Sequence, residues 1–346
     1  MAEIRLGRTG IVTEQNAFGA LPIQRVSKEE AASLLQRAYD NGMTFFDTAR
    51  GYSDSEEKIG YALSGVRDKI NISTKIFIST ALDNPVADFF DKLETSLKML
   101  NTDYVDIVQF HNPGFCPKPD DGTGLYEAAL KAKEQGKARF IGFTNHRLPV
   151  AHEAIESGLY DTLQFPFSYL ATDKDIELVK ACKEKDMGFI AMKALSGGLI
   201  TNSAAAYAYL AQFDNVLPIW GIQRESELDE FISYFASPPT LNDDLQKVID
   251  ADRKDLSGNF CRGCGYCMPT CPAEIKISEC ARMSLFIRRA PSAPLFKEPW
   301  TSFMKKIEDC TQCGQCIEHC PYSLDTPTLL QNNYKDYLEQ LSANAM

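Results

Sequence analysis

The sequence lacks several features that would place it in a specialised class of protein. It contains no run of 18 apolar residues, and its first residues contain no apolar stretch of the kind found in signal peptides. Positive charge is scarce, because 36 lysines and arginines face 47 acidic residues and leave a formal net charge of −11. Nonspecific binding of nucleic acid needs a basic surface. We therefore expect a cytoplasmic protein with neither a nucleic-acid partner nor a membrane partner.

No repeat at solenoid spacing and no low-complexity segment is found along the chain. The composition is ordinary for a globular protein, with 44% hydrophobic and 24% charged residues. A length of 346 residues suits one large domain followed by a small one. The boundary between the two domains is marked by consecutive prolines at 238–239 and by polar residues at 242–244. The expected domains are 1–240 and 241–346.

Short apolar runs alternate with amphipathic stretches through the first 236 residues. Several of these runs are nearly continuous in apolar residues, which is typical of strands buried on both faces. Ser27 and Glu30 form a capping box that predicts a helix start, and residues 91–100 place leucines at helical spacing. The eight candidate strands are 16–21, 44–48, 70–76, 104–111, 139–144, 162–167, 188–194 and 216–222.

Eight strands alternating with about eight helices predict an α/β fold, a parallel (β/α)8 TIM barrel. An open, doubly wound sheet is the alternative architecture. Such a sheet usually begins with a glycine-rich turn after its first strand. Here the first strand leads into Gly19-Ala-Leu-Pro22 without such a turn, which favours the barrel. A short charged helix is expected at 243–254, between the barrel and the region that follows.

Eight of the eleven cysteines fall in two short runs near the C-terminus. The runs share one spacing, in which three cysteines two residues apart precede a fourth that is followed by proline. In two-cluster ferredoxins the first three thiolates hold one iron–sulfur cube, and the fourth ligates the other cluster. The sequence therefore predicts two 4Fe-4S clusters. One ligand set is Cys261, Cys264, Cys267 and Cys320, and the other is Cys310, Cys313, Cys316 and Cys271.

Two structural zinc sites are an alternative interpretation of these runs, but such sites take two ligands from each of two knuckles. Disulfides fit less well, because neighbouring thiols of a CxxC motif satisfy disulfide geometry poorly in a reducing compartment. The long spacer between the runs and the C-terminal tail both predict helices, so the domain resembles the all-helical ferredoxin type. We expect the remaining cysteines, Cys116, Cys182 and Cys280, to be structural. For Cys116, which follows the fourth strand, a place in an active-site loop is the alternative.

Four polar residues of the predicted barrel lie at or just beyond the C-terminal ends of its second, third and fourth strands. These residues are Asp47, Tyr52, Lys75 and His111. Each has an ordinary structural explanation when taken alone, such as a turn cap, a loop tyrosine, a snorkelling lysine or a satisfied core histidine. The C-terminal end of the strands, however, is where TIM barrels assemble their chemistry. The shared placement of these four residues therefore predicts an active site.

The segment from Asp47 to Gly60 resembles the second-strand motif of the aldo-keto reductase family, with aspartate and tyrosine five residues apart. Residues 72–75 and 108–111 are similar to the lysine and histidine segments of that family. The resemblance covers roughly residues 1–236. Some members carry a C-terminal cluster domain, and the Cys-Met-Pro sequence at 267–269 is similar to theirs.

The resemblance implies hydride transfer between NADP or NAD and a small-molecule carbonyl or alcohol substrate. Tyr52 would act as the general acid and base, because reduction leaves an alkoxide that must be protonated. An isolated tyrosine has a pKa near ~10, so the Lys75 ammonium, with Asp47 as counter-ion, would bring it nearer neutrality. His111 would orient the carbonyl.

The resemblance also implies a nicotinamide site after strands five to eight. Lys193 stands where the family often has a stacking tyrosine, and Glu227 stands where it has an arginine for the 2′-phosphate. These departures predict a weaker preference for NADPH over NADH than is usual in the family. The expected cofactor-binding residues are Thr144, Asn145, Gln164, Lys193, Gly197, Gly198, Gly221, Gln223 and Arg224.

Two other functions remain open. A nicotinamide transfers two electrons together and a cluster transfers one, so electron flow between them would need a flavin. The chain contains no evident flavin motif. If electrons do move between the nicotinamide and the clusters, a partner flavoprotein is therefore expected. The second alternative is a redox-sensing binding subunit, although the intact set Asp47, Tyr52, Lys75 and His111 argues against a purely binding role.

Overall fold

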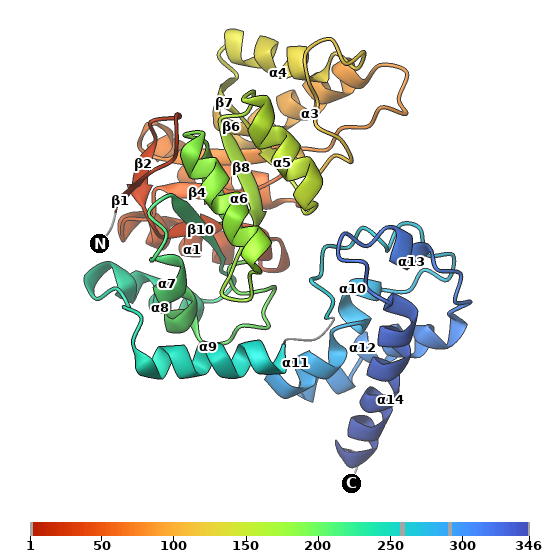
Figure 1. Cartoon of the computed structure of the whole chain (residues 1–346). Coiled ribbons are helices and arrows are strands. Elements are labelled where there is room, and N and C mark those ends of the chain that lie inside the picture. Colours follow the sequence, from red (N-terminus) through yellow and green to blue (C-terminus); the bar gives the residue numbers. More distant parts are fainter. Residues whose placement is uncertain (1–2, 257–259, 290–292, 345–346) are drawn as a thin grey trace. The chain divides into compact units, whose positions relative to one another are not determined.

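The computed structural model describes residues 3–256, 260–289 and 293–344. The chain forms two compact units, whose helices and strands are labelled in Figure 1. The first unit contains Met1–Leu195 and Asn202–Val248, and the second contains Ser196–Thr201 and Ile249–Met346.

The first unit is a closed barrel of parallel strands in the order β10-β3-β4-β5-β6-β7-β8-β9. Every strand predicted from an apolar run is present, within two residues at either end. The bounds are Ala17–Gly19 (β3), Phe45–Asp47 (β4), Asn71–Ile76 (β5), Val105–His111 (β6), Ala138–Thr144 (β7), Thr162–Pro166 (β8), Gly188–Met192 (β9) and Val216–Gly221 (β10). The barrel prediction is therefore confirmed, and the open-sheet alternative is excluded.

A small antiparallel hairpin precedes the barrel and was not anticipated from the sequence. Its strands are Glu3–Arg5 (β1) and Val12–Glu14 (β2). Ile4 and Ile11 belong to one buried cluster with Phe45, at the start of β4. The hairpin therefore packs against the amino-terminal end of the barrel, opposite the end at which the candidate catalytic residues lie.

Helices connect successive strands of the barrel, as the alternating pattern predicts. The Ser27–Glu30 capping box is present, with the Glu30 amide donating to Ser27 Oγ at 3.2 Å and the Ser27 amide donating to Glu30 Oε2 at 2.9 Å. The helix predicted at 91–100 begins earlier, because Asn84 caps its first turn and Pro85 occupies the first helical position. The helices are Lys28–Asp40 (α1), Ser55–Leu63 (α2), Pro85–Leu100 (α3), Leu125–Glu134 (α4), Leu148–Ser157 (α5), Asp173–Glu184 (α6), Ser203–Leu210 (α7) and Glu225–Ala236 (α8).

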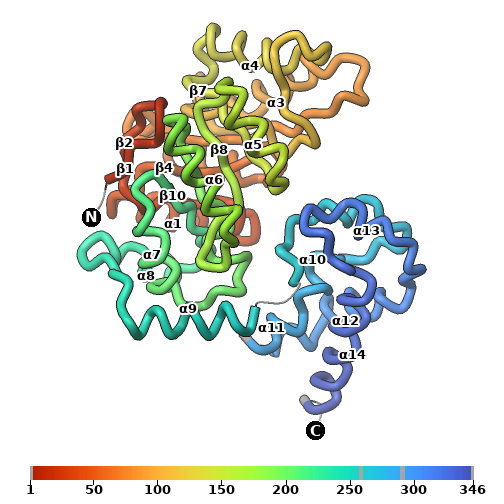
Figure 2. The backbone as a smooth tube through the Cα atoms, viewed as in Figure 1, coloured from red at the N-terminus to blue at the C-terminus, as the bar shows by residue number. Residues whose placement is uncertain are grey.

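The second unit is mainly helical, and the described residues of this unit contain no strand. The tube in Figure 2 can be followed through it in the blue part of the chain. Its buried core includes Cys280, Met283, Met304, Leu330 and Tyr337. The helices are Asp243–Asp255 (α9), which spans the division between the units, Ile277–Cys280 (α10), Met283–Arg289 (α11), Trp300–Lys305 (α12), Gln315–Glu318 (α13) and Thr326–Asn344 (α14).

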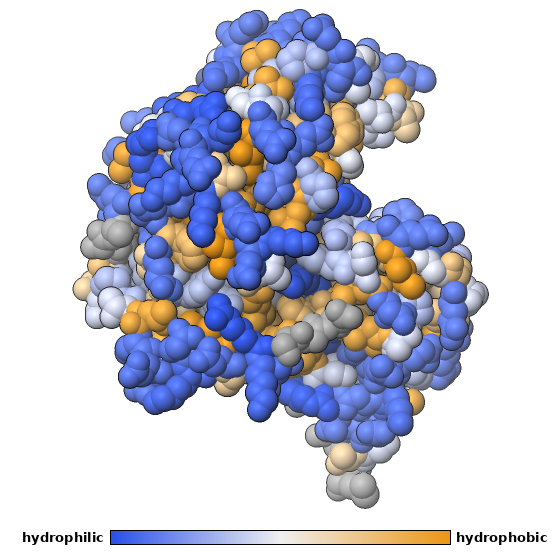
Figure 3. Space-filling model, in the orientation of Figure 1, coloured by the Kyte–Doolittle hydropathy of each residue, from blue (hydrophilic) through white to orange (hydrophobic). Residues whose placement is uncertain are grey.

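Apolar side chains are mainly interior. On the face drawn in Figure 3, hydrophilic side chains cover most of the surface and apolar ones form separate patches. Among the described residues, no helix has the length and apolar character that crossing a bilayer requires.

Candidate active site and cluster site

Neighbouring strands bring the four candidate catalytic residues to one end of the barrel. Asp47 is the last residue of β4, His111 is the last residue of β6, and Lys75 is the next-to-last residue of β5 between them. Tyr52 follows β4 in the loop before α2. Parallel strands end on the same side of a sheet, so these side chains meet at the carboxyl end of the barrel.

Lys75 and Asp47 form an ion pair inside the barrel. The Lys75 Nζ lies 2.6 Å from Asp47 Oδ2 and also donates to the carbonyl oxygen of Thr48 at 2.6 Å. Burial raises the pKa of Asp47, and the ammonium of Lys75 opposes that shift. Burial lowers the pKa of Lys75, but the charge of Asp47 and the phenol of Tyr52 outweigh it, so the net shift is upward. Lys75 therefore remains charged.

The ring of Tyr52 lies over this lysine, with Nζ at 5.0 Å from the ring centroid. Burial raises the pKa of Tyr52; Lys75 lowers it and Asp47 raises it by smaller amounts. The net direction is upward, opposite to the shift expected from Lys75 alone, because burial disfavours the phenolate. Tyr52 is thus held in the protonated form.

His111 is positioned by aromatic contacts. Its ring stacks on Phe77, with centroids 4.2 Å apart, and meets Tyr52 edge-on at 5.9 Å. Its Nδ1 is buried and has no hydrogen-bond partner among the described residues. Burial, with a smaller contribution from Lys75, lowers the pKa of His111 to about 3. The imidazole is therefore neutral and can donate or accept a hydrogen bond without carrying charge.

Gln164, expected to bind the nicotinamide, lies against the ion pair. Its Nε2 donates to Asp47 Oδ2 at 3.3 Å, and its Oε1 accepts from Gln109 Nε2 at 2.5 Å. Gln109 also donates to Ser73 Oγ at 2.7 Å. The sequence reasoning overlooked Gln109, although its position two residues before His111 on β6 places it on the same face of the strand.

The loop after β7 uses its own polar groups internally. Asn145 Nδ2 donates to the carbonyl oxygen of Pro113 at 2.8 Å, and Asn145 Oδ1 accepts from the amides of His146 and Arg147 at 2.9 and 2.8 Å. The Thr144 hydroxyl contacts the sulfur of Met192 at 3.9 Å. Asn145 therefore shapes this loop, whatever else it binds.

His146 is a second buried histidine near this end of the barrel, and the sequence reasoning missed it. Burial lowers its pKa well below the usual value, and the nearby Lys193 and His111 add to the shift. Its signal in the sequence was its position directly after the Thr144-Asn145 pair.

The two residues before α8 donate their amides to a side chain in the first turn of this helix. The backbone amides of Gln223 and Arg224 donate to Glu227 Oε2 at 2.8 and 3.1 Å. The Arg224 side chain is exposed and lies 3.6 Å from the other oxygen of Glu227. Gly221 ends β10, just before this turn. A carboxylate of the chain itself therefore accepts from two amides that could otherwise bind an anion there.

Other predicted cofactor residues lie on the connection after β9. Lys193 has a left-handed φ of 55°. Gly197 and Gly198 have φ values of 67° and 92°, which favour glycine, and they belong to the segment that groups with the second unit. The carbonyl oxygen of Gly197 accepts from Arg282 Nη1 at 3.2 Å.

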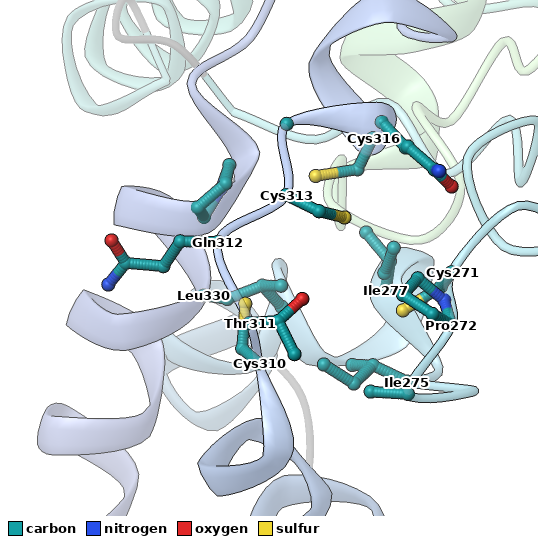
Figure 4. Close-up of a pocket in the computed structure, with 14 residues that line it drawn as sticks. Cys271, Pro272, Ile275, Ile277, Cys310, Thr311, Gln312, Cys313, Cys316 and Leu330 are labelled. Atoms are coloured by element: carbon teal, nitrogen blue, oxygen red, sulfur yellow. The ribbon is translucent and has the colours of Figure 1, made fainter.

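The second cysteine set lines a cavity in the helical unit. Figure 4 shows Cys271, Cys310, Cys313 and Cys316 around one space. The cavity contains about 350 Å³ not filled by protein atoms, part of it open to solvent. Ile275, Ile277 and Leu330 are among its apolar lining residues. Four thiols around an apolar cavity suit an iron–sulfur cube.

The members of the first set also lie near one another. Burial raises the pKa of Cys261, and Cys264 and Cys320 are near enough to contribute. Burial also raises the pKa of Cys267 to about 12, and Cys261 and Cys264 contribute. Cys320 thus lies near the first run, and Cys271 contributes to the raised pKa of Cys316 in the second. This proximity fits the exchange of the fourth cysteine between runs.

The fold and these sites define a class of protein, a parallel barrel joined to a cysteine-rich helical domain. The model of the Aldo/keto reductase family matches residues 15–205, and that of the 4Fe-4S dicluster domain matches residues 260–324. The chain belongs to the aldo/keto reductase family and carries a 4Fe-4S dicluster domain. The family resemblance seen in the sequence is therefore confirmed.

Individual relatives are distant. The L-galactose dehydrogenase of Arabidopsis thaliana is 28% identical over 210 residues, with 57% of this chain and 66% of that protein covered. The chain spans slightly less than two thirds of the length of the first two curated relatives, at 65% and 66%.

Solved structures share the barrel. The holo form of aldo-keto reductase AKR11C1 from Bacillus halodurans has a TM-score of 0.63 at 18% identity, and the match covers 73% of this chain and 96% of that one. An aldo-keto reductase from Klebsiella pneumoniae, solved in complex with NADPH, has a TM-score of 0.61 at 19% identity, covering 72% and 95%. At these identities the likeness is one of fold alone.

Proposed function

We propose that the protein is an NAD(P)-dependent oxidoreductase that interconverts a small-molecule carbonyl and the corresponding alcohol. The observation that carries the proposal is the buried Lys75–Asp47 ion pair, which lies beneath the phenol of Tyr52 and next to the neutral His111. A protonated phenol, a fixed cation and a neutral imidazole at one end of a barrel are the groups that carbonyl reduction needs.

Tyr52 is the proton donor in this scheme. Its raised pKa keeps the O–H bond intact at neutral pH, so it can protonate the oxygen of the carbonyl as negative charge develops there. Lys75 favours the resulting phenolate by its charge, and Asp47 holds the ammonium in place. His111 hydrogen-bonds the same carbonyl oxygen and aligns it. A nicotinamide would supply or accept the hydride when bound.

The cofactor site is the less complete part of the proposal. Thr144, Asn145, Gln164 and Lys193 lie at the carboxyl end of the barrel or just beyond it, and they are the proposed contacts of the nicotinamide. The proposed phosphate contacts are Gly197, Gly198, Gly221, Gln223 and Arg224. Glu227 already holds the amides of Gln223 and Arg224, which supports use of NADH as well as NADPH.

The second part of the proposal concerns the cysteines. Cys261, Cys264, Cys267 and Cys320 would hold one 4Fe-4S cluster, and Cys310, Cys313, Cys316 and Cys271 the other. None of the eleven cysteines forms a disulfide, which suits a reducing compartment such as the cytoplasm. The proposed boundary between the barrel domain and the cluster domain lies near residue 240.

Transfer of single electrons to a partner flavoprotein is a second candidate function. Cys313 is exposed and borders the partly open cavity of the second ligand set. A cluster held there would be close to the surface, as exchange with another protein requires.

Turnover of a panel of aldehydes and ketones under anaerobic conditions, with NADH and NADPH, tests the main proposal. Cofactor oxidation with at least one carbonyl, lost in Tyr52→Phe, supports it. No turnover by protein that carries its clusters and binds nicotinamide would contradict it and favour the electron-transfer function.

A further inference from the structure

The guanidinium of Arg282 packs on the loop that carries the first cysteine run. Gly263 in that loop has a φ of 64°, and a Cβ added there would lie 2.8 Å from the Cζ of Arg282. The amide of Gly263 donates to the Sγ of Cys261 at 3.4 Å. Arg282 thus touches the backbone unit whose amide contacts a proposed cluster ligand.

Several contacts fix Arg282 in this position. Its Nε donates to the carbonyl oxygen of Ser278 at 2.8 Å, and its Nη1 donates to that of Gly197 at 3.2 Å. The guanidinium also lies over the ring of Phe286, 4.7 Å from the centroid. The two hydrogen bonds and the ring contact together hold the guanidinium at a defined place beside the loop.

The surroundings of the second cysteine set are different. Cys313 is exposed, whereas Cys261 and Cys267 are both buried. Lys306, which is close enough to Cys271 to interact electrostatically, forms an ion pair with Asp309 at 2.8 Å. Both partners are about half exposed, and charges in such a position are screened by water and salt.

We propose that Arg282 raises the reduction potential of the cluster held by Cys261, Cys264, Cys267 and Cys320, so that two clusters with identical cysteine spacing accept electrons at different potentials. Reduction adds one negative charge to a cluster, and a cation held close to that cluster favours the more negative state. Arg282 is in this sense a positioning residue that acts on the cluster through space. The inference rests on the proposed presence of two clusters.

Redox titration of the full chain, purified anaerobically and followed by electron paramagnetic resonance, tests this role. We expect two midpoint potentials in the wild type. Arg282→Gln should lower one of them and leave the other unchanged, whereas Arg282→Lys, which keeps the charge, should stay near the wild type. Arg288→Gln is the matched control, because Arg288 pairs with Asp336 at 2.6 and 2.8 Å, and it should change neither potential.

The inference is overturned if Arg282→Gln leaves both potentials in place or shifts them equally, as general loosening of the domain would. Iron content separates loss of a cluster from a change in its potential. If Arg282→Gln does not retain its clusters, the Arg282→Lys variant tests the proposal instead. Two midpoint potentials equal to those of the wild type support the role of charge. A lowered midpoint potential in Arg282→Lys contradicts it. A wild type with well under about eight irons would instead contradict the two-cluster proposal itself.

Discussion

The Nζ of Lys75 lies 2.6 Å from the Oδ2 of Asp47, with only 1% and 3% of the two side chains exposed. An ammonium so well shielded acts strongly on neighbouring groups, because little water screens its charge. Burial of Tyr52 nevertheless has the larger effect on that phenol, and raises its pKa. The candidate active site therefore holds a charged lysine beneath a protonated tyrosine.

Replacing Tyr52 by Phe should reduce carbonyl turnover by about 10²–10⁴-fold or more, since the substitution removes the proton donor and little volume. Nicotinamide binding, followed by fluorescence titration, should be nearly unchanged. Tyr61→Phe, at an exposed tyrosine on α2, serves as the control and should retain activity. Wild-type turnover in Tyr52→Phe would rule out the assignment of the proton donor.

The pH dependence should differ between the two directions. Oxidation of an alcohol needs the phenolate of Tyr52 as base, and the raised pKa of this group means that oxidation should still be increasing with pH in the alkaline range. Reduction of a carbonyl needs the protonated phenol of Tyr52, so its rate should fall only in the alkaline range. His111, with a pKa of about 3, should produce no change in rate near pH 6.5.

Lys75→Met should shift the alkaline pKa of the rate profile further upward, because the ammonium is the group that lowers the pKa of Tyr52. Residual activity measured between pH 7 and 11 reports the shift. Lys92→Met, at a partly exposed lysine paired with Asp88, is the control and should leave the profile alone. An unchanged profile in Lys75→Met would show that Lys75 does not tune Tyr52.

Discrimination between cofactors should be weak, since Glu227 places a carboxylate on the amides of Gln223 and Arg224. Glu227→Gln should improve binding of NADPH relative to NADH, because it removes negative charge from the region proposed to meet the 2′-phosphate. Glu225→Gln is the matched control, as Glu225 pairs with Arg37 instead. A hundredfold preference of the wild type for NADPH, about 2.7 kcal/mol, would contradict the prediction.

Protein purified anaerobically should carry about eight irons and eight sulfides, with absorbance that bleaches on reduction. Cys271→Ala and Cys320→Ala should each damage the cluster ligated mainly by the other run. Cys280→Ala tests specificity, because this thiol is buried in the same unit and contacts the carbonyl oxygen of Phe303, yet is not a proposed ligand. It should keep full iron content. Zinc in place of iron, or four irons in the wild type, would contradict the two-cluster assignment.

Much of the architecture followed from local pattern. Strands buried on both faces need nearly continuous apolar runs, so the run at 104–110 identified β6 within one residue. The ends of parallel strands share one side of a sheet, so the sequence predicts that Asp47, Lys75 and His111 lie together. The spacing of the cysteine runs is equally local. By contrast, the β1–β2 hairpin was missed, because its strands are only three residues long.

The barrel fold, the spacing of the cysteine runs and the end of the barrel at which the candidate catalytic residues lie can all be predicted from the sequence. The pKa values and contacts of these groups depend on the folded structure. The upward shift of the pKa of Tyr52, the contact of Gln109 with Gln164, and the packing of Arg282 on Gly263 all depend on burial or on residues far apart in the chain. Spacing along a chain reveals which side chains can share a face, but solvation and charge depend on everything that packs around them, and that is settled only when the chain has folded.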